Sequence, residues 1–158
     1  EKYAGTEAPP ATSRALYTEL QAETPDSLKP LLSDLFEHIT LWTLGADSAR
    51  AEPENGAWRV TLYVDASKAR ADSIGKQTPF AMDDLVEVGV FGPILPGSSE
   101  PEVLYLRQHH IRSGTQAIEV TVNKRPTSAG IDPYRKFIQR ERGDNFAEIT
   151  SRAGEKRN

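Results

Sequence analysis

The sequence predicts a mainly-β protein, an immunoglobulin-like β-sandwich of about seven strands with one or two α-helices before it. Three observations predict this class: apolar and polar residues alternate with a period of two in several segments, turn residues separate these segments at fairly regular spacing, and a helical apolar pattern lies near the N-terminus. We expect a helical junction over residues 1–38, the sandwich over 39–126, and a C-terminal segment over 127–158 that packs on the sandwich and frays at its end.

Two helix starts are expected before the first strand. Thr12-Ser13 can cap a short helix that ends near Ala22. Thr24-Pro25 gives a second start signal, although Pro30 is awkward inside a helix and the regular part can begin there instead.

The second helix carries an apolar stripe, which must be buried. We expect it to pack on the sandwich, because its last residue leads directly into the first strand; the alternative is that the stripe covers a neighbouring upstream domain. The stripe comprises Leu28, Leu31, Leu32, Leu35, Phe36 and Ile39.

The strands are expected from their alternation. The clearest covers residues 58–66, and a hairpin joins 103–112 to 115–124 around Ser113-Gly114. Residues 85–91 form another strand, and 40–43 and 46–52 are two short strands separated by a break at Gly45. The inward positions of the two clearest strands are Val60, Leu62, Val64, Ile118, Val120 and Val122.

Composition argues against several functional classes. The 158 residues carry 19 basic and 23 acidic side chains, a formal net charge of −4, which gives no reason to expect nucleic-acid binding. There is no Cys, so no disulfide and no thiol nucleophile is possible. No apolar run approaches the ~20 residues of a membrane-spanning helix, so this segment is not expected to span a membrane.

No residue pattern of catalysis is evident, so we expect no enzyme, no cofactor and no metal site. The only histidines are His38, His109 and His110, and none fits the H-E-x-x-H spacing of a zinc peptidase. His109 and His110 are adjacent in a predicted strand and therefore point to opposite faces, one half-buried and one exposed. Asp83-Asp84 is a possible metal-ligand pair, but a solvated strand entrance or turn is favoured. Trp42 and Trp58 are expected in the core.

The segment Gly130-Ile131-Asp132-Pro133-Tyr134 has two interpretations. In the first, Asp132-Pro133 starts a turn while Ile131 and Tyr134 plug one end of the sandwich. In the second, the segment docks against a neighbouring domain, with Ile131, Asp132 and Tyr134 as the docking residues.

Residues 31–42, 58–66 and 129–134, together with Met82-Asp83-Asp84 and residues 88–91, carry a family resemblance. From about Leu16 to Asn145, the chain resembles the C-terminal end of bacterial membrane proteins that fuse an ABC-type transporter permease to a zinc aminopeptidase. This resemblance implies a non-catalytic accessory domain of an inner or plasma membrane protein, placed outside the cytoplasm. The domain would pack against the upstream peptidase-like domain of the same chain. The family's H-E-x-x-H has no matching position, so no catalytic residue carries over.

Two other functions stay open. A stand-alone peptide- or carbohydrate-binding β-sandwich module would present exposed aromatic residues on a solvated face, with Tyr63 and Tyr105 as candidates. A small metal-dependent hydrolase would use Asp83, Asp84, His109 or His110, and it is the least favoured of the three.

Overall fold

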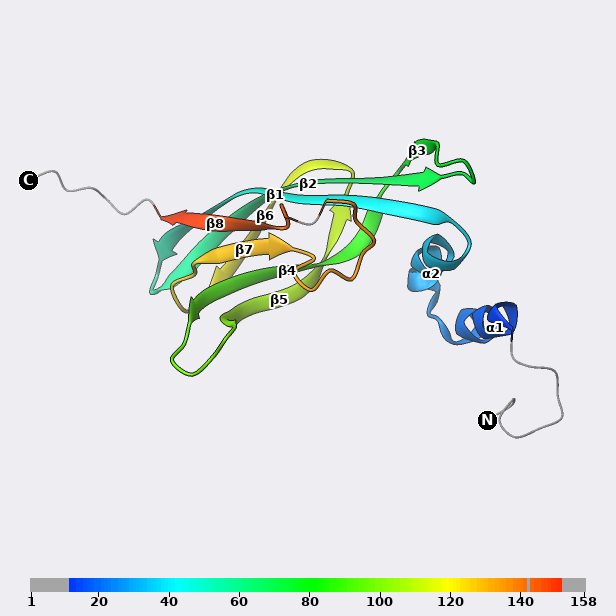
Figure 1. Cartoon of the computed structure of the whole chain (residues 1–158). Coiled ribbons are helices and arrows are strands. Elements are labelled where there is room, and N and C mark those ends of the chain that lie inside the picture. The colour runs from blue at the N-terminus through cyan, green and yellow to red at the C-terminus, as the bar shows by residue number, and fades with distance from the viewer. Residues whose placement is uncertain (1–11, 142, 152–158) are drawn as a thin grey trace, which may run out of the picture. The chain divides into compact units, whose positions relative to one another are not determined.

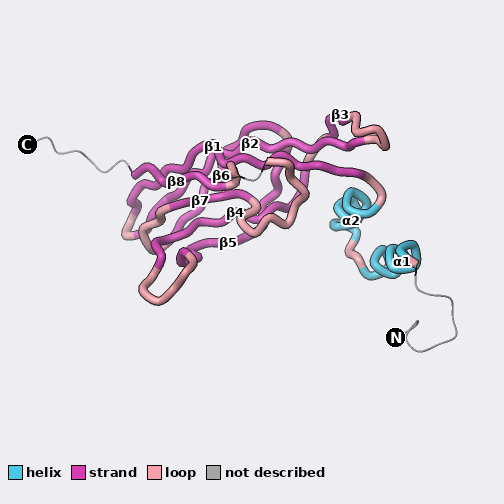
Figure 2. The backbone as a smooth tube through the Cα atoms, in the orientation of Figure 1, coloured by secondary structure: helices cyan, strands magenta, loops and turns pink. Residues whose placement is uncertain are grey.

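The computed structural model describes residues 12–141 and 143–151 of the chain. It divides into two compact units, a helical unit up to Thr40 and a β unit from Leu41 onward. Figure 1 labels their elements, and Figure 2 shows that the helices are confined to the first unit.

The helical unit begins close to the predicted position. Helix α1 (Ser13–Glu23) is capped by Thr12, whose side chain accepts a hydrogen bond from the Ala15 backbone N–H at 3.2 Å. A short 3₁₀ turn, η1 (Asp26–Leu28), leads into α2 (Lys29–Phe36). Pro30 lies in the first turn of α2, where its missing N–H breaks no helical hydrogen bond.

The apolar stripe is only partly buried within the described residues, and what covers the rest of it stays a prediction. Leu32 is buried and Leu31 is half-buried, but the other members are exposed. Helix α2 has only eight residues, so the stripe extends beyond it at both ends. The Tyr17 ring of α1 lies 5.7 Å from the Phe36 ring but leaves it largely exposed. The exposed members are Leu28, Leu35, Phe36 and Ile39.

Eight strands follow, and they form one strongly curled, mixed half-barrel sheet (Figure 1). The sheet order is β3-β2-β1-β8-β7-β4-β5, and β6 also pairs with β2. Strands β1 and β8 run parallel, whereas the β2–β3, β2–β6, β4–β5, β4–β7 and β7–β8 pairs are antiparallel. The strands are β1 (Ile39–Glu54), β2 (Ala57–Ala71), β3 (Gln77–Phe80), β4 (Asp83–Ile94), β5 (Pro101–Arg112), β6 (Gly114–Val122), β7 (Ser128–Ile131) and β8 (Phe146–Ser151).

The mainly-β class with N-terminal helices is confirmed, but the described strands do not clearly form a sandwich. The physical reason is β8, which lies in the C-terminal segment expected to pack on the sandwich. It pairs with both β1 and β7 and so links the two halves of the curled sheet. Gly45 does not break β1 but lies buried within it, so the two short strands expected there are one. The hairpin expected between residues 103–112 and 115–124 is also wrong, because β5 pairs with β4 whereas β6 pairs with β2.

The predicted inward face is confirmed as core. All six residues expected on the two clearest strands are buried, and Val60 pairs with Val120 and Leu62 with Ile118 across the β2–β6 ladder. Val86, Val88 and Val90 of β4 are fully buried as well. Alternation along each strand therefore places one continuous apolar face inside the curl.

We expect Val120→Ala to lower the free energy of unfolding by about 1–3 kcal/mol, because it removes buried methyl groups and leaves a cavity. Thr121→Ala is the matched control, since Thr121 is the next residue on β6 and its side chain is exposed. Urea unfolding of both variants checks this. Equal losses would contradict the assignment of the inward face.

Candidate docking groove

An apolar groove of about 370 Å³ lies over strands β4, β5, β7 and β8. Val103, Phe146 and Tyr134 are 48%, 45% and 54% exposed, although all three are large and apolar or aromatic. Contiguous exposed apolar surface of this kind is typical of binding sites. The groove is lined by Phe91, Glu100, Pro101, Val103, Ser128, Pro133, Tyr134, Phe146, Ala147 and Glu148.

Two glycines leave room for the rings of the groove. Gly89 pairs with Gly130 between β4 and β7, and Gly130 pairs with Phe146 on β8. A Cβ atom at Gly89 would lie 2.6 Å from the Phe91 ring, and one at Gly130 would lie 2.9 Å from the Phe146 ring. The Phe91 and Phe146 rings, with centroids 5.7 Å apart, therefore occupy the space that two side chains would otherwise fill.

Tyr134 is held at the groove by a loop built around a buried carboxylate. Asp132 is 1% exposed and has a positive φ of 46°, a conformation that Asp tolerates better than most residues. Its carboxylate accepts hydrogen bonds from the backbone N–H groups of Lys136 (2.8 Å) and Phe137 (3.1 Å) and from Gln139 Nε2 (3.0 Å). Its own N–H donates to the Glu87 carbonyl at 2.7 Å. We call residues 132–141 the Asp132 loop.

The Asp132 loop is also fixed to β1. The backbone N–H of Trp42 donates to the Ile138 carbonyl at 3.0 Å, and the backbone N–H of Leu44 donates to Gln139 Oε1 at 3.2 Å. The Phe137 ring packs edge-on against Trp42, with centroids 5.2 Å apart. These contacts hold both ends of the loop in place.

The three predicted docking residues have different environments. Ile131 is fully buried in the core and Asp132 is buried within its loop, whereas Tyr134 is exposed. The turn at Asp132-Pro133 is confirmed by the Arg135 N–H, which donates to the Asp132 carbonyl at 3.0 Å. Ile131 fills the interior as expected, but Tyr134 does not plug it. The docking role stays a prediction, and of the three residues only Tyr134 offers a side chain for it.

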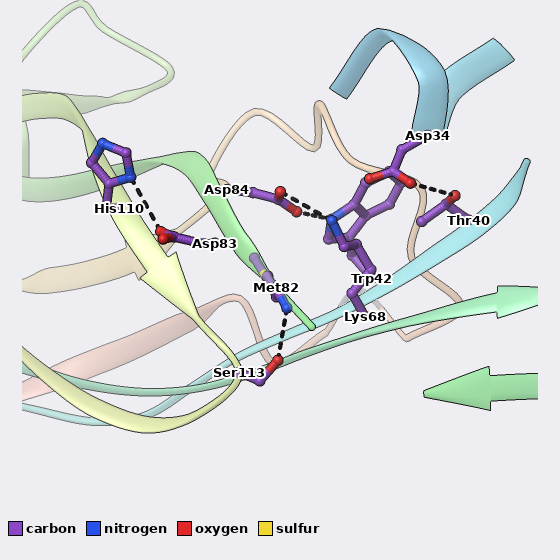
Figure 3. A network of polar contacts seen from close by, with 9 residues as sticks. All are labelled: Asp34, Thr40, Trp42, Lys68, Met82, Asp83, Asp84, His110 and Ser113. Carbon is purple, nitrogen blue, oxygen red and sulfur yellow. Dashed lines mark hydrogen bonds and ion pairs between the residues drawn. The ribbon is translucent and has the colours of Figure 1, made fainter. Parts of the chain in front are cut away.

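A buried polar cluster joins β1, β2 and β4 (Figure 3). Trp42 Nε1 donates to Asp84 Oδ2 at 2.7 Å, and Lys68 Nζ lies 3.1 Å from Asp84 Oδ1. The side chains of Lys68 and Asp84 are 4% and 9% exposed, so the two opposite charges attract each other at a place where water solvates neither well. Within the helical unit, Thr40 Oγ1 donates to Asp34 Oδ1 at 3.4 Å.

Asp83 and Asp84 do not act as a pair. Asp84 belongs to the buried cluster, which corrects its expected place at a solvated strand entrance. Asp83 is exposed beside His110 Nδ1 (3.2 Å) and Arg112 Nε (3.7 Å). Adjacent strand residues point to opposite faces, which is why the two carboxylates separate.

His109 is half-buried and His110 exposed, as predicted. Burial lowers the pKa of His109, and its Nε2 lies 2.8 Å from the Tyr105 hydroxyl. Within residues 12–141 and 143–151, no group of three or more His, Cys, Asp or Glu side chains is placed to hold a metal ion.

The aromatic residues expected on a solvated binding face lie outside the groove. Tyr63 and Tyr105 are half-buried, with guanidinium groups of Arg50 and Arg107 about 6 Å from their rings. Trp42 lies in the core as predicted, but Trp58 is only half-buried. Trp58 lines a second hollow of about 410 Å³ with Ala51, Pro93, Arg125, Pro126, Thr127 and Ile149.

Sequence reasoning missed Phe91, Val103 and Phe146 as groove residues. The irregularities of the β4–β5 ladder lie on either side of Phe91. The spacing Gly89-x-Phe91 is a local signal for a ring folded over its own strand. Phe146 has no such signal, because its glycine neighbour belongs to a different strand.

No family model, no curated protein and no solved structure matches the chain. In the part of the chain that the structure describes, the helices are too short and too polar to cross a membrane.

We expect Gly130→Ala to destabilise the protein by about 1–3 kcal/mol, the usual cost of overpacking. The new Cβ atom would lie 2.6 Å from the Asn145 carbonyl oxygen, which is backbone and cannot turn away. Gly143→Ala is the matched control, because a Cβ atom there meets nothing within 4 Å and Gly143 has no positive φ. Thermal unfolding of both variants measures the difference, and an unchanged Gly130→Ala variant would contradict the packing of Phe146 over the sheet.

Proposed function

We propose that this chain is a non-catalytic accessory domain whose groove receives a segment of a neighbouring domain. The observation that carries the proposal is the combination of exposed apolar walls with a rigid support. Tyr134, Val103 and Phe146 face solvent, while the buried Asp132 carboxylate fixes the loop that presents Tyr134. A preorganised apolar groove loses little conformational entropy when it binds a partner.

The resemblance stated from the sequence names the partner in this proposal. The neighbour is the upstream peptidase-like domain of a membrane-bound transporter and peptidase-like protein, and the accessory domain lies outside the cytoplasm. The Gly130–Tyr134 segment, which is part of that resemblance, continues from β7 into the wall of the groove. The sequence motif and the apolar surface thus coincide, which supports the docking interpretation of the motif.

A stand-alone binding module is the second candidate function, because the same groove has the size of a ligand pocket. In that case the groove would bind a free peptide or carbohydrate and would contact no other domain of its own protein.

The purified chain is expected to bind no stoichiometric zinc and to hydrolyse no aminoacyl substrate. The physical reason is the separation of the potential ligands: His109 contacts Tyr105, His110 contacts Asp83, and Asp84 neutralises buried Lys68. Metal analysis by mass spectrometry and an aminoacyl-anilide assay check this. A tightly bound zinc lost on His109→Ala or His110→Ala would contradict it.

The docking proposal is tested in the complete gene product. With the photoreactive residue p-benzoylphenylalanine at Tyr134, we expect crosslinks to the peptidase-like domain, identified by mass spectrometry. The same residue at Ile74, which is 86% exposed in the β2–β3 connection, is the control and should give far fewer. A Tyr134 probe that crosslinks no better than the Ile74 probe argues against docking and leaves the stand-alone module.

A further inference from the structure

The charge of the groove is of one sign. Its only charged lining residues are Glu100 and Glu148, and both are exposed. Among the described residues neither carboxylate has an ion-pair partner. Two nearby acids differ in this respect: Glu102 pairs with Lys124, and Glu87 pairs with Lys136 at 2.6 Å. The groove thus combines apolar walls with two carboxylates that no cation of residues 12–141 or 143–151 neutralises.

This combination disfavours two kinds of occupant. A carbohydrate would bury hydroxyl groups that need hydrogen-bond partners, and the side chains lining the groove offer few beyond Ser128, Tyr134 and the two carboxylates. An anionic membrane surface would be repelled by Glu100 and Glu148. A polypeptide is favoured because one short segment can present an apolar side chain and a cation side by side.

We propose that the groove binds a polypeptide segment in which a large apolar side chain is flanked by Lys or Arg. The apolar side chain lies between Val103, Tyr134 and Phe146 and covers Phe91, and the cation lies against Glu100 and Glu148. Burial of the apolar side chain supplies most of the affinity, and the carboxylates select the partner and accelerate its association. This inference rests on the proposed docking role of the groove and adds the chemistry of the partner.

The experiment uses fluorescein-labelled peptides in a Gly-Ser host and the whole chain, with binding measured by fluorescence anisotropy. One peptide carries Leu-Phe flanked by Lys, the second carries Leu-Phe flanked by Glu, and the third keeps the Lys residues but replaces Leu-Phe by Ser. We expect the first peptide to bind at least about tenfold more tightly than either of the others. Its affinity should fall as the salt concentration is raised.

Two variants test the site. Tyr134→Ala is expected to lower the affinity for the first peptide by about tenfold or more, because an aromatic contact at an interface is lost. The double variant Glu100→Gln, Glu148→Gln should remove the preference for Lys over Glu and flatten the salt dependence. Ile74→Ala and Glu119→Gln are the controls, because they change a more exposed apolar residue and an exposed carboxylate on β6, both outside the groove.

The outcomes separate this inference from the docking proposal. Equal binding of the Lys and Glu peptides overturns the charge preference, and crosslinks from Tyr134 would still support docking. Binding of anionic vesicles or of a glycan panel in preference to all peptides overturns the inference as well. If no peptide binds even at millimolar concentration, the inference fails, and if Tyr134 also gives no interdomain crosslinks, the docking proposal fails with it.

Discussion

The buried carboxylate of Asp132 is the interaction on which the architecture of the β unit depends. It gathers two backbone N–H groups and the Gln139 amide within a single loop. A buried carboxylate is tolerated only when such donors satisfy it. The loop then hydrogen-bonds to β1 through Ile138 and Gln139. By leading the chain away from β7 and across to β1, it brings β8 to the position where it pairs with both strands.

The link between the two halves of the sheet and the groove have a common origin in β8. Because β8 is inserted between β1 and β7, Phe146 at its start lies opposite Gly130. The Phe146 ring then covers Gly130, which has no side chain, and packs against the Phe91 ring of β4. The outer face thus gains an apolar surface that is not part of the core, while Val88 and Val90 on the inner face remain fully buried. A stable interior and an exposed apolar surface are compatible here because alternate residues of β4 contribute to each face.

The carboxylates of the β unit also differ in whether they face the interior or the solvent. Asp84 points inward, where Lys68 and the Trp42 indole satisfy it, and this cluster joins three strands at one end of the sheet. Such a pair contributes little net stability compared with apolar packing, but removing Lys68 would leave the Asp84 carboxylate without its cation in a site of low solvent exposure. The carboxylates of Glu100 and Glu148 lie at the groove surface instead, where water solvates them.

The sequence by itself determined the local elements of this protein. Thr12 predicted the start of α1, and alternation between Trp58 and Ala66 predicted a strand whose inward valines and leucine are buried as expected. These features depend on neighbouring residues only, since a cap or a period of two acts within a few positions. The same local rules placed His109 and His110 on opposite faces.

Tertiary structure alone decided the topology and the groove. Ala49 pairs with Ile149 and Gly130 with Phe146, and no short-range pattern encodes pairings between segments so far apart or across a long loop. The burial of Asp84 and the exposure of Tyr134 likewise follow from which strands and loops lie beside them. Gly45 shows the same limit, since a glycine that predicts a break is held inside a strand when its neighbours supply the hydrogen bonds. The topology and the groove depend on long-range pairing, because each strand is stabilised by the strands beside it. The sequence of one strand does not specify which strands these are.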